Sequence, residues 1–482
     1  MEVGAAPSAR AVPWVATVTQ QLHEPSEHEP SPSPGSPIEL SEELTEAVQE
    51  ALEQGDAERA ADLAAPLHVA DQADLLEQLG REDRATLVAQ LEPQLDPELL
   101  TYLDETVREE VLDQLGPQQA GAALAQLDTD DAIEILEDLD PAEQMALLET
   151  LPMPERAAVE AGLAYPEDSA GRLMQRDFVA APEFWTVGQT IDYLRANPNL
   201  PDDFYDLYII NPRYEPVGSI PLSKVVRSKR GVLLTELRVK ELHLVPVELD
   251  QEKVGFMFRQ YGLVSAPVID VNGRMLGVIT VDDVVDVIEE EAQEDILKLG
   301  GLRETDLFQT PLRAGLRRFP WLMINLGTAI LASVVIAQFE EAIEQIVALA
   351  VLMPIVASMG GNGGTQTVTV VVRALATREI TPANAMRVLG KEFLVGGFNG
   401  LLFLVTGVLI AVLWFGNLVL GVLFGIALLI TLIFAALAGV VIPIAFDRFG
   451  VDPALASGVF MTTVTDVVGF LSFLGLASIY LL

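Results

Sequence analysis

The sequence predicts a multidomain membrane protein with four parts: an α-helical superhelical N-terminal domain, a tandem pair of α/β units, a long connecting helix and a five-helix transmembrane domain. Two observations lead to this fold class. Half of the 482 residues are apolar, yet the formal net charge is -41. Residues 313–482 hold eight basic and eight acidic residues, so residues 1–312 carry 21 basic against 62 acidic ones. The chain therefore combines a strongly acidic soluble part with a neutral, apolar part.

The charge also limits the class of partner. Nucleic acid needs cationic contacts to its phosphates, so an acidic excess of this size excludes it and favours cations. The chain has no cysteine, which excludes a disulfide framework and a Cys-based zinc site. Residues 1–36 are rich in Pro, Ser and Glu, and we expect them to form a disordered leader.

The soluble part begins with an acidic helical-repeat domain, expected to span residues 37–165. Its leucines recur every twelve residues, and each follows another apolar residue by four positions, so both lie on one helix face. Each unit is therefore a short helix followed by a turn, and stacked units bury their apolar stripes on one another. Asp128 and Asp131 are candidate cation ligands here, although a solvated helix cap is the commoner role. The repeating residues are Leu79, Leu91, Leu103, Leu115, Leu127, Leu139 and Leu151.

Residues 166–290 repeat a different pattern. The segments "DLYIINPRYEPVGSIPLSKVV" and "VSAPVIDVNGRMLGVITVDDVVDV" each predict a strand, a turn, a second strand containing Val-Gly and a helix start. Two such copies resemble a pair of CBS domains, which is a regulatory module. In that family a hydroxyl and a following Asp often hold an adenine nucleotide, so Thr280 and Asp283 make ATP a candidate ligand. The first copy departs from the pattern at Pro221 and Lys224, and a helix cap is an equally good role for Thr280 and Asp283.

The segment "VVDVIEEEAQEDILKLGG" predicts a strongly acidic helix that ends at Gly300-Gly301. Residues 291–312 connect the soluble part to the membrane part, so this helix lies next to the mouth of the membrane domain. Its carboxylates repel one another and attract divalent cations, although an acidic surface helix is usually only solvated.

The apolar part predicts five membrane spans, because about 20 apolar residues cross a bilayer. One charge-free run is too long for a single helix, and Gly416-Asn417 is its natural point of division. With the N-terminus inside, all eight basic residues fall on inner loops or flanks, as the positive-inside rule requires. We therefore expect a multi-pass protein of the cell (inner) membrane whose soluble part lies in the cytoplasm. The predicted spans are Phe319–Phe339, Ile346–Val372, two within Phe393–Phe446, and Pro453–Leu482.

The last span contains one carboxylate, Asp466. It lies twelve residues, or about 18 Å, beyond Ala454 and hence near the middle of the membrane. Thr462 and Thr463 place hydroxyls on the same helix face. Acids at this depth are costly and usually face a water-filled path. The structural alternative is a protonated Asp that is hydrogen-bonded between helices.

The second span contains "GGNGGTQ", which we expect to interrupt the helix and to expose the carbonyls of Gly360 and Gly361 and the side chain of Asn362 to a cavity. Carbonyl and carboxylate oxygens are hard ligands suited to Mg²⁺ or Ca²⁺. Since Mg²⁺ gives up its waters reluctantly, these groups would hold a hydrated ion. The alternative is that the glycines let helices pack closely.

The segments "PIVASMGGNGGTQTVTVVVRALA" and "TTVTDVVGF", with five spans, a CBS pair and an acidic helical domain, resemble the MgtE family of magnesium channels, also described as transporters. The resemblance implies a homodimer with one pore on its two-fold axis, Asp466 of both chains at the central ion site, and passive flow of Mg²⁺. It also implies that the connecting helix is a plug that closes the pore when Mg²⁺ bridges the acidic domains. The carboxylates that match the family's pattern are Asp250, Glu252, Asp283, Asp286, Glu291 and Glu294, with Glu392 and Asp452 on the membrane side.

The predicted function is a Mg²⁺-selective channel for passive uptake that is closed by cytosolic Mg²⁺, and not an enzyme. Two alternatives stay open. One is a CBS-regulated carrier of another divalent cation. The other is an intramembrane aspartyl hydrolase in which two copies of Asp466 divide the acid and base roles. The hydrolase is disfavoured because the spans contain no second acid, and because His23, His28, His68 and His243 all lie outside the membrane part.

Overall fold

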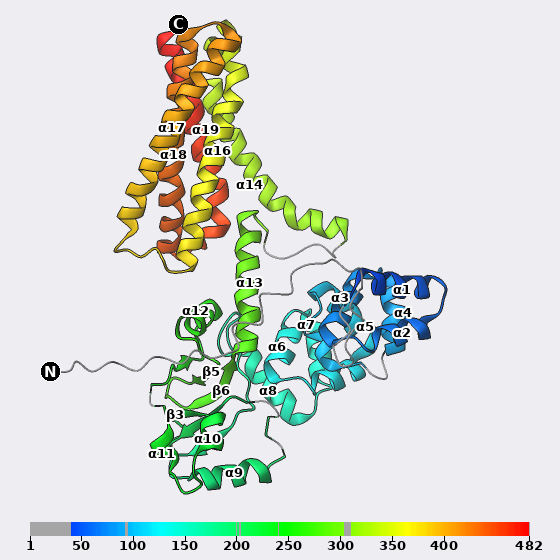
Figure 1. The fold of residues 1–482 in the computed structure, drawn as a ribbon. Coiled ribbons are helices and arrows are strands. Elements are labelled where there is room, and N and C mark those ends of the chain that lie inside the picture. The colour runs from blue at the N-terminus through cyan, green and yellow to red at the C-terminus, as the bar shows by residue number, and fades with distance from the viewer. Residues whose placement is uncertain are drawn as a thin grey trace, which may run out of the picture. The chain divides into compact units, whose positions relative to one another are not determined.

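The structure is a computed structural model that describes residues 40–91, 95–198, 200–201, 204–239, 241–302 and 310–481. The predicted leader, residues 1–36, lies outside the described residues. The chain divides into two compact units, residues 1–93 and residues 94–482. Figure 1 shows the elements of both.

The first unit contains four helices with a common apolar core. Val48, Leu75 and Leu87 are fully buried in it. The guanidinium of Arg84 is also buried and donates hydrogen bonds to the carbonyl oxygens of Leu76 (2.8 Å) and Leu79 (3.0 Å), which satisfies its donors inside the unit. The helices are α1 (Glu42–Glu53), α2 (Ala57–Ala64), α3 (Val69–Gln78) and α4 (Arg81–Leu91).

The second unit opens with the remaining helical repeats. Short helices and turns alternate as the leucine spacing predicts, and Leu103 and Leu151 are buried between them. Helix α5 contains two repeats, joined at Gly116, where a φ of 73° suits glycine. The elements are η2 (Pro97–Leu100), α5 (Glu105–Leu124), α6 (Thr129–Glu137), α7 (Pro141–Leu148) and α8 (Met153–Leu163).

Two three-stranded sheets follow, and their matching topology confirms the predicted tandem repeat. In each sheet the first strand pairs in parallel with the second, which pairs antiparallel with the third. Both antiparallel ladders shift register near the end of their second strand, at Ile209/Ile210 and at Val268/Ile269. The strands are β1 (Ala180–Pro182), β2 (Asp206–Ile210), β3 (Pro216–Pro221), β4 (Val245–Pro246), β5 (Ser265–Ile269) and β6 (Met275–Thr280).

Helices complete the two copies, and the last of them becomes the connecting helix. Helix α13 runs unbroken from the end of β6 to Leu299 and ends at Gly300, as the acidic segment predicts. The helices are α9 (Val187–Ala196), α10 (Leu222–Arg227), α11 (Leu234–Leu237), α12 (Gln251–Tyr261) and α13 (Val281–Leu299).

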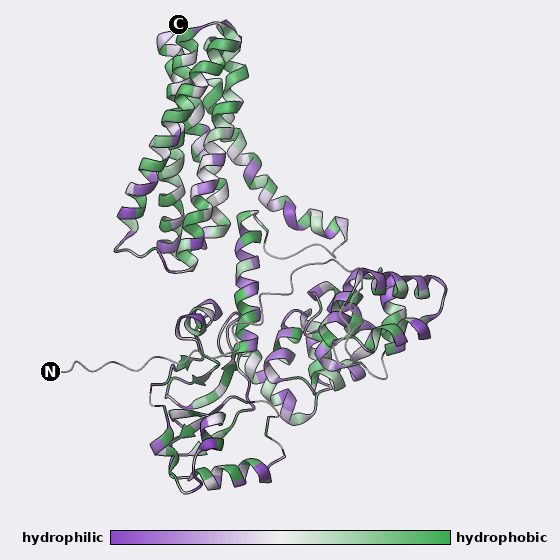
Figure 2. Ribbon diagram, in the orientation of Figure 1, coloured by the Kyte–Doolittle hydropathy of each residue, from purple (hydrophilic) through white to green (hydrophobic). Residues whose placement is uncertain are grey.

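The membrane part is a helical bundle. Among the described residues, five of its helices are long and apolar enough to cross a membrane, and Figure 2 shows their largely hydrophobic composition. The predicted division at Gly416-Asn417 is confirmed. Gly416 adopts a φ of 67°, and Asn417 caps the next helix by accepting a hydrogen bond from the amide of Leu420 (3.1 Å). The helices are α14 (Pro311–Ala337), a short α15 (Glu340–Gln345), α16 (Val347–Ala376), α17 (Ala385–Phe415), α18 (Leu418–Phe449) and α19 (Pro453–Tyr480).

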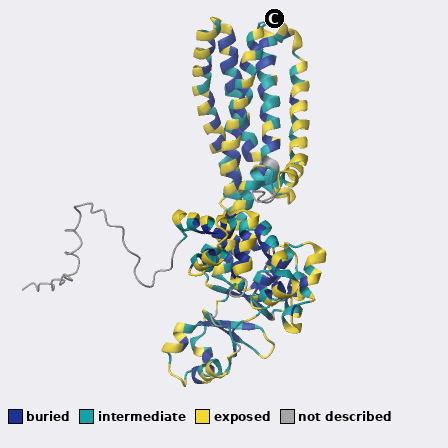
Figure 3. Ribbon diagram, turned by 90° about the vertical axis from the view of Figure 1, so that its right-hand side faces the viewer, coloured by how far each residue is buried: buried dark blue, intermediate teal, exposed yellow. Residues whose placement is uncertain are grey.

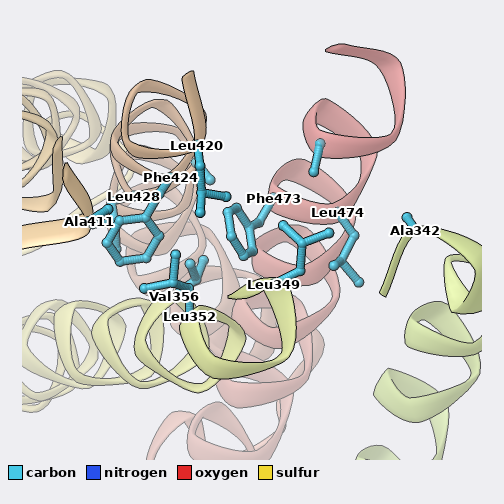
Figure 4. Close-up of a cluster of buried hydrophobic side chains, with 12 residues drawn as sticks. Ala342, Leu349, Leu352, Val356, Ala411, Leu420, Phe424, Leu428, Phe473 and Leu474 are labelled. Carbon is cyan, nitrogen blue, oxygen red and sulfur yellow. The ribbon is translucent and has the colours of Figure 1, made fainter. Parts of the chain in front are cut away.

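The core of the bundle lies between α16, α18 and α19. Figure 4 shows Leu352 and Val356 of α16 beside the rings of Phe424 and Phe473, whose centroids are 5.7 Å apart in an edge-to-face arrangement. Figure 3 shows that buried residues concentrate inside the bundle. Among the described residues, helix α18 has more buried residues than any other helix of the bundle.

The predicted interruption of the second span is wrong, because α16 is continuous through its glycine segment. The close approach of neighbouring helices explains the glycines. A Cβ atom on Gly360 would lie 2.5 Å from the Thr431 side chain, and one on Gly364 would lie 1.9 Å from that of Met461. At Gly361 the space is open, but its carbonyl oxygen accepts a hydrogen bond from the Thr365 hydroxyl (2.9 Å). The packing alternative therefore accounts for Gly360 and Gly364.

Candidate ion pathway and acidic control region

Polar side chains form a stripe on the uncovered face of α16. Asn362, Thr365, Gln366 and Thr369 are spaced by three and four residues, so they share one helix face, and all four are exposed. We call them the polar stripe. Polar side chains at membrane depth are costly in lipid and are found facing protein or water. Something other than lipid is therefore expected to cover this face.

Asp466 of α19 lies at a matching depth. It is 13 residues, about 20 Å, from the start of α19 at Pro453, and Asn362 is 14 residues, about 21 Å, from the end of α16 at Ala376. Consecutive spans alternate in direction, so both ends are on the same side of the bundle. Asp466 is half-buried and, within the described part of the chain, makes no hydrogen bond or ion pair.

Thr462 and Thr463 do not extend their hydroxyls toward Asp466. Each donates a hydrogen bond to the carbonyl oxygen of Val459 in the preceding turn, at 3.0 and 2.7 Å. Thr462 is nevertheless exposed and lies on the wall of a pocket with Thr365 and Thr369 of the polar stripe. The structure therefore brings Thr462 and the polar stripe to one place, one helical turn from Asp466.

The end of α13 meets the bundle at this pocket, which has a volume of ≈ 270 Å³. Leu299 and Gly300 form part of its wall. The side chain of Leu299 packs against a small apolar cluster that includes Ala454 and Met461 of α19. A Cβ atom on Gly458 would lie 3.4 Å from the carbonyl oxygen of Leu299. The acidic connecting helix thus ends where the polar stripe reaches the edge of the membrane part.

A first acidic cluster lies between the start of α6 and the start of α13. Asp128, at the N-cap of α6, and Asp131 interact electrostatically with Asp283 of α13. Burial, followed by the charges of Asp283 and Asp128, raises the pKa of Asp131 to about 7. Burial also raises the pKa of Asp286, with the charge of Glu134 adding to it. These carboxylates disfavour one another's charged forms.

Asp130 belongs to this cluster and was not predicted. It is 7% exposed, and among the described residues neither of its carboxylate oxygens has a hydrogen-bond partner. Burial, and then the charges of Asp283 and Asp131, raise its pKa well above the ordinary value. A buried carboxylate without a partner is costly when it is charged, and either protonation or a bound cation would relieve this cost.

A second acidic cluster lies between α12 and α13. Gln251 of α12 donates a hydrogen bond to Glu291 (3.0 Å), which positions that carboxylate. Burial raises the pKa of Glu291 to about 7. The hydrogen bond from Gln251 acts to lower this pKa, and the charges of Glu294 and Glu252 act to raise it. Burial and the charge of Asp250 raise the pKa of Glu252. Four of the predicted carboxylates, Asp250, Glu252, Glu291 and Glu294, are thus brought together.

Among the described residues, no three or more His, Asp or Glu side chains are arranged closely enough to hold a metal ion. The acidic clusters are therefore pairs and rows of repelling carboxylates and not a preformed metal cage. Binding a divalent cation here requires either water-mediated contacts or a small movement of the elements.

The two membrane-side carboxylates differ in their surroundings. Asp452 caps α19 by accepting a hydrogen bond from the amide of Ala454 (2.7 Å), and its other oxygen lies 2.8 Å from the ammonium of Lys298 on α13. Glu392 is buried in α17, and its ion pair is with the adjacent Lys391 (3.5 Å). The structure therefore joins Asp452 to α13, whereas none of the described contacts joins Glu392 to it.

The candidate nucleotide residues are already hydrogen-bonded to each other. The Thr280 hydroxyl donates to the Asp283 carboxylate (2.5 Å). The same carboxylate accepts a hydrogen bond from the Thr280 amide (3.4 Å), as in a capping box at the start of α13. Asp283 also faces the first acidic cluster. ATP binding at this pair stays a prediction.

Comparison with known proteins identifies the family. A family model described as "Divalent cation transporter" matches residues 353–476, one described as "MgtE intracellular N domain" matches residues 67–168, and a CBS domain model matches residues 235–290. The magnesium transporter MgtE of Thermus thermophilus is 36% identical over 331 residues, which cover 68% of this chain and 73% of that protein. The magnesium transporter MgtE of Bacillus subtilis is 33% identical over 328 residues, with the same coverage.

The chain belongs to the MgtE family. The three family models match this chain in the order intracellular N domain, CBS domain and transporter domain. Among solved structures, the cytosolic domain of the Mg²⁺ channel MgtE in complex with ATP is 30% identical with a TM-score of 0.47, covering 50% of this chain and 99% of that chain. A crystal structure of the soluble part of a magnesium transporter is 27% identical with a TM-score of 0.46, covering 52% and 99%.

Proposed function

We propose that the protein is a Mg²⁺ channel for passive uptake, closed by cytosolic Mg²⁺ that binds at the acidic interfaces between the helical-repeat domain, the CBS pair and α13. Membership of the MgtE family supports Mg²⁺ as the transported ion. One observation carries the gating proposal. The helix that bears the regulatory carboxylates ends in the pocket at the edge of the polar stripe.

The proposed ion path runs along the polar stripe and past Asp466. The carboxylate of Asp466 supplies the negative charge, and the side chains of Asn362 and the neighbouring hydroxyls can bind the water shell of the ion. Gly360 contributes by letting the helices approach, and Thr462 lies at the inner entrance. Hard oxygen groups at this spacing suit a hydrated Mg²⁺.

A second copy of the chain is the proposed cover of the polar stripe. In one copy the stripe and α14 are exposed, and only Ala332 of α14 is buried among the described residues of that helix. A two-fold axis beside α16 and α19 would place two stripes and two Asp466 carboxylates around one path. The chain has no cysteine, so a single introduced cysteine reports on this arrangement without background.

Gln366→Cys in the polar stripe is therefore expected to form a cross-linked dimer in membranes with a short bismaleimide. Leu394→Cys on α17, which is exposed and apolar, is the matched control and should stay monomeric on a denaturing gel. Cross-linking of Leu394→Cys with none at Gln366→Cys would contradict the placement of the axis.

The conduction test is flux of Mg²⁺ into liposomes that contain the purified full chain and an indicator dye. Asp466→Asn should reduce the flux to the level of empty liposomes while the protein remains dimeric. Asp447→Asn, an exposed Asp at the inner end of α18, makes the same chemical change outside the path and should conduct normally. Unchanged flux in Asp466→Asn would refute the pore assignment. Uptake of Ca²⁺, Mn²⁺ and Co²⁺ in the same assay tests a carrier of another divalent cation.

The gating test varies Mg²⁺ on the cytosolic side. Many weak carboxylate sites favour the compact arrangement by binding it better than the splayed one, which predicts closure in the millimolar range. Asp131→Asn combined with Asp283→Asn should raise the Mg²⁺ concentration needed for half-closure. Closure at the same concentration as in the wild type would place the sensor elsewhere.

A further inference from the structure

Lys298 occupies an unusual position on the acidic connecting helix. Its ammonium lies 2.5 Å from a carboxylate oxygen of Glu294, one turn back on α13, and 2.8 Å from Asp452 at the start of α19. The Lys298 side chain is 19% exposed. It therefore forms a partly buried ion pair that spans from the cytosolic half to the membrane half.

The electrostatic surroundings of Lys298 are strongly negative. Burial alone would lower its pKa, but hydrogen bonds to Asp452 and Glu294 and the charges of both carboxylates raise it above the ordinary value. Asp295 lies close by, and the charge of Asp452 raises the pKa of Asp295 in addition to burial. An ammonium thus sits between two carboxylates that, without it, would repel each other across the junction of α13 and α19.

We infer that Lys298 is a tethered counterion of the gate, which holds the end of α13 against α19 in the absence of Mg²⁺ and occupies the position where a divalent cation would bridge Glu294 and Asp452. This inference rests on the proposed gating function and refines its regulation. The consequence is that closure has a Mg²⁺-independent component, and that this junction binds Mg²⁺ only when the ammonium moves away.

Removing the ammonium therefore has two opposite effects. Without Mg²⁺, the uncompensated carboxylates of Glu294 and Asp452 repel each other, so α13 detaches more readily from the bundle. With Mg²⁺, the freed carboxylates take up an additional ion that the wild type excludes. A purely structural lysine would produce only the first effect.

The test compares full-length wild type, Lys298→Met, Lys298→Arg and Lys229→Met in liposomes. Lys229 is an exposed lysine of the first CBS copy and controls for the loss of one positive charge. In EDTA, amide hydrogen exchange at the end of α13 should be faster in Lys298→Met than in the wild type by at least about tenfold. Addition of 10 mM Mg²⁺ should restore protection. Lys298→Arg and Lys229→Met should behave as the wild type does.

Flux measurements give the second readout. Lys298→Met should conduct more than the wild type at low cytosolic Mg²⁺ and should close more steeply as Mg²⁺ rises. Equal exchange in Lys298→Met and Lys229→Met would overturn the inference, and so would faster exchange that Mg²⁺ does not reverse. If Mg²⁺ failed to close the wild-type channel, the proposed gating would be refuted. The comparison of hydrogen exchange in EDTA would still test the role of Lys298, because it does not depend on closure by Mg²⁺.

Discussion

Replacing Asp130 by Asn should stabilise the Mg²⁺-free protein and weaken its response to Mg²⁺. Asn keeps the shape of the side chain but removes a buried charge that faces Asp131 and Asp283. Asn is still a buried polar group without a partner, so it relieves only the extra cost that the charge adds. At a pH where Asp130 is ionised, an extra cost of about 1–3 kcal/mol means that Asn should slow local opening of α6 about five- to 150-fold in EDTA. Hydrogen exchange of the α6 amides measures this opening directly.

The Mg²⁺ response supplies the second half of the prediction. If an ion with a dissociation constant of about 1 mM binds the compact form through Asp130, 10 mM Mg²⁺ stabilises that form by about 1.4 kcal/mol, which slows exchange about tenfold. Asp130→Asn should lose most of this slowing. The matched control is Asp140→Asn, because Asp140 is exposed and makes no side-chain cap hydrogen bond on α7. Equal Mg²⁺-induced slowing in Asp130→Asn and the wild type would refute the assignment.

Two further predictions follow from the same structure. The raised pKa values of about 7 for Asp131 and Glu291, against ordinary values of 3.8 and 4.5, mean that the compact form binds more protons. The resulting stabilisation is complete below those ordinary values and is lost as the pH rises through 7, so proteolysis near α13 in EDTA should be slower at pH 6 than at pH 8. Gly364→Leu should destabilise the bundle by about 1–3 kcal/mol in thermal unfolding, since its Cβ would meet Met461, whereas Gly361→Ala faces open space and should be tolerated.

Most of the architecture could be predicted because it depends on patterns that local physics enforces. A charge-free run longer than one span needs a turn, and Gly416-Asn417 supplies both the left-handed residue and the cap. The two sheets repeat because the same alternation of apolar strand, turn and Val-Gly strand occurs twice. The interruption predicted for the glycine segment of α16 was wrong because glycine is compatible both with a break in a helix and with close packing of a continuous one. The glycines are explained by close packing against Thr431 and Met461 in a continuous helix, and only the tertiary structure provides these neighbours.

Asp130 could not be singled out from the sequence. Three aspartates occur within four residues at the start of α6, and by composition they are equivalent. Helical phase does not separate them either, because Asp128, Asp130 and Asp131 lie three or four residues before the buried Ala132, Ile133 and Ile135. Whether the buried carboxylate would find a partner depends on α13, which follows 150 residues later and cannot be placed from spacing alone.

The acidic excess and the single junction lysine lead to one physical account of the gate. Carboxylates that are spread over an exposed surface destabilise a protein only slightly, because water and salt screen the repulsion between their charges. Here they face one another across element boundaries, from α6 to α13 and from α12 to α13, where burial makes repulsion effective. In the proposed gate, the compact arrangement is therefore near balance with the splayed one, and a small number of bound divalent ions would shift this equilibrium. In the proposed gate, Lys298 would provide a fixed part of the missing positive charge where α13 meets α19, so that cytosolic Mg²⁺ would have to supply only the remainder.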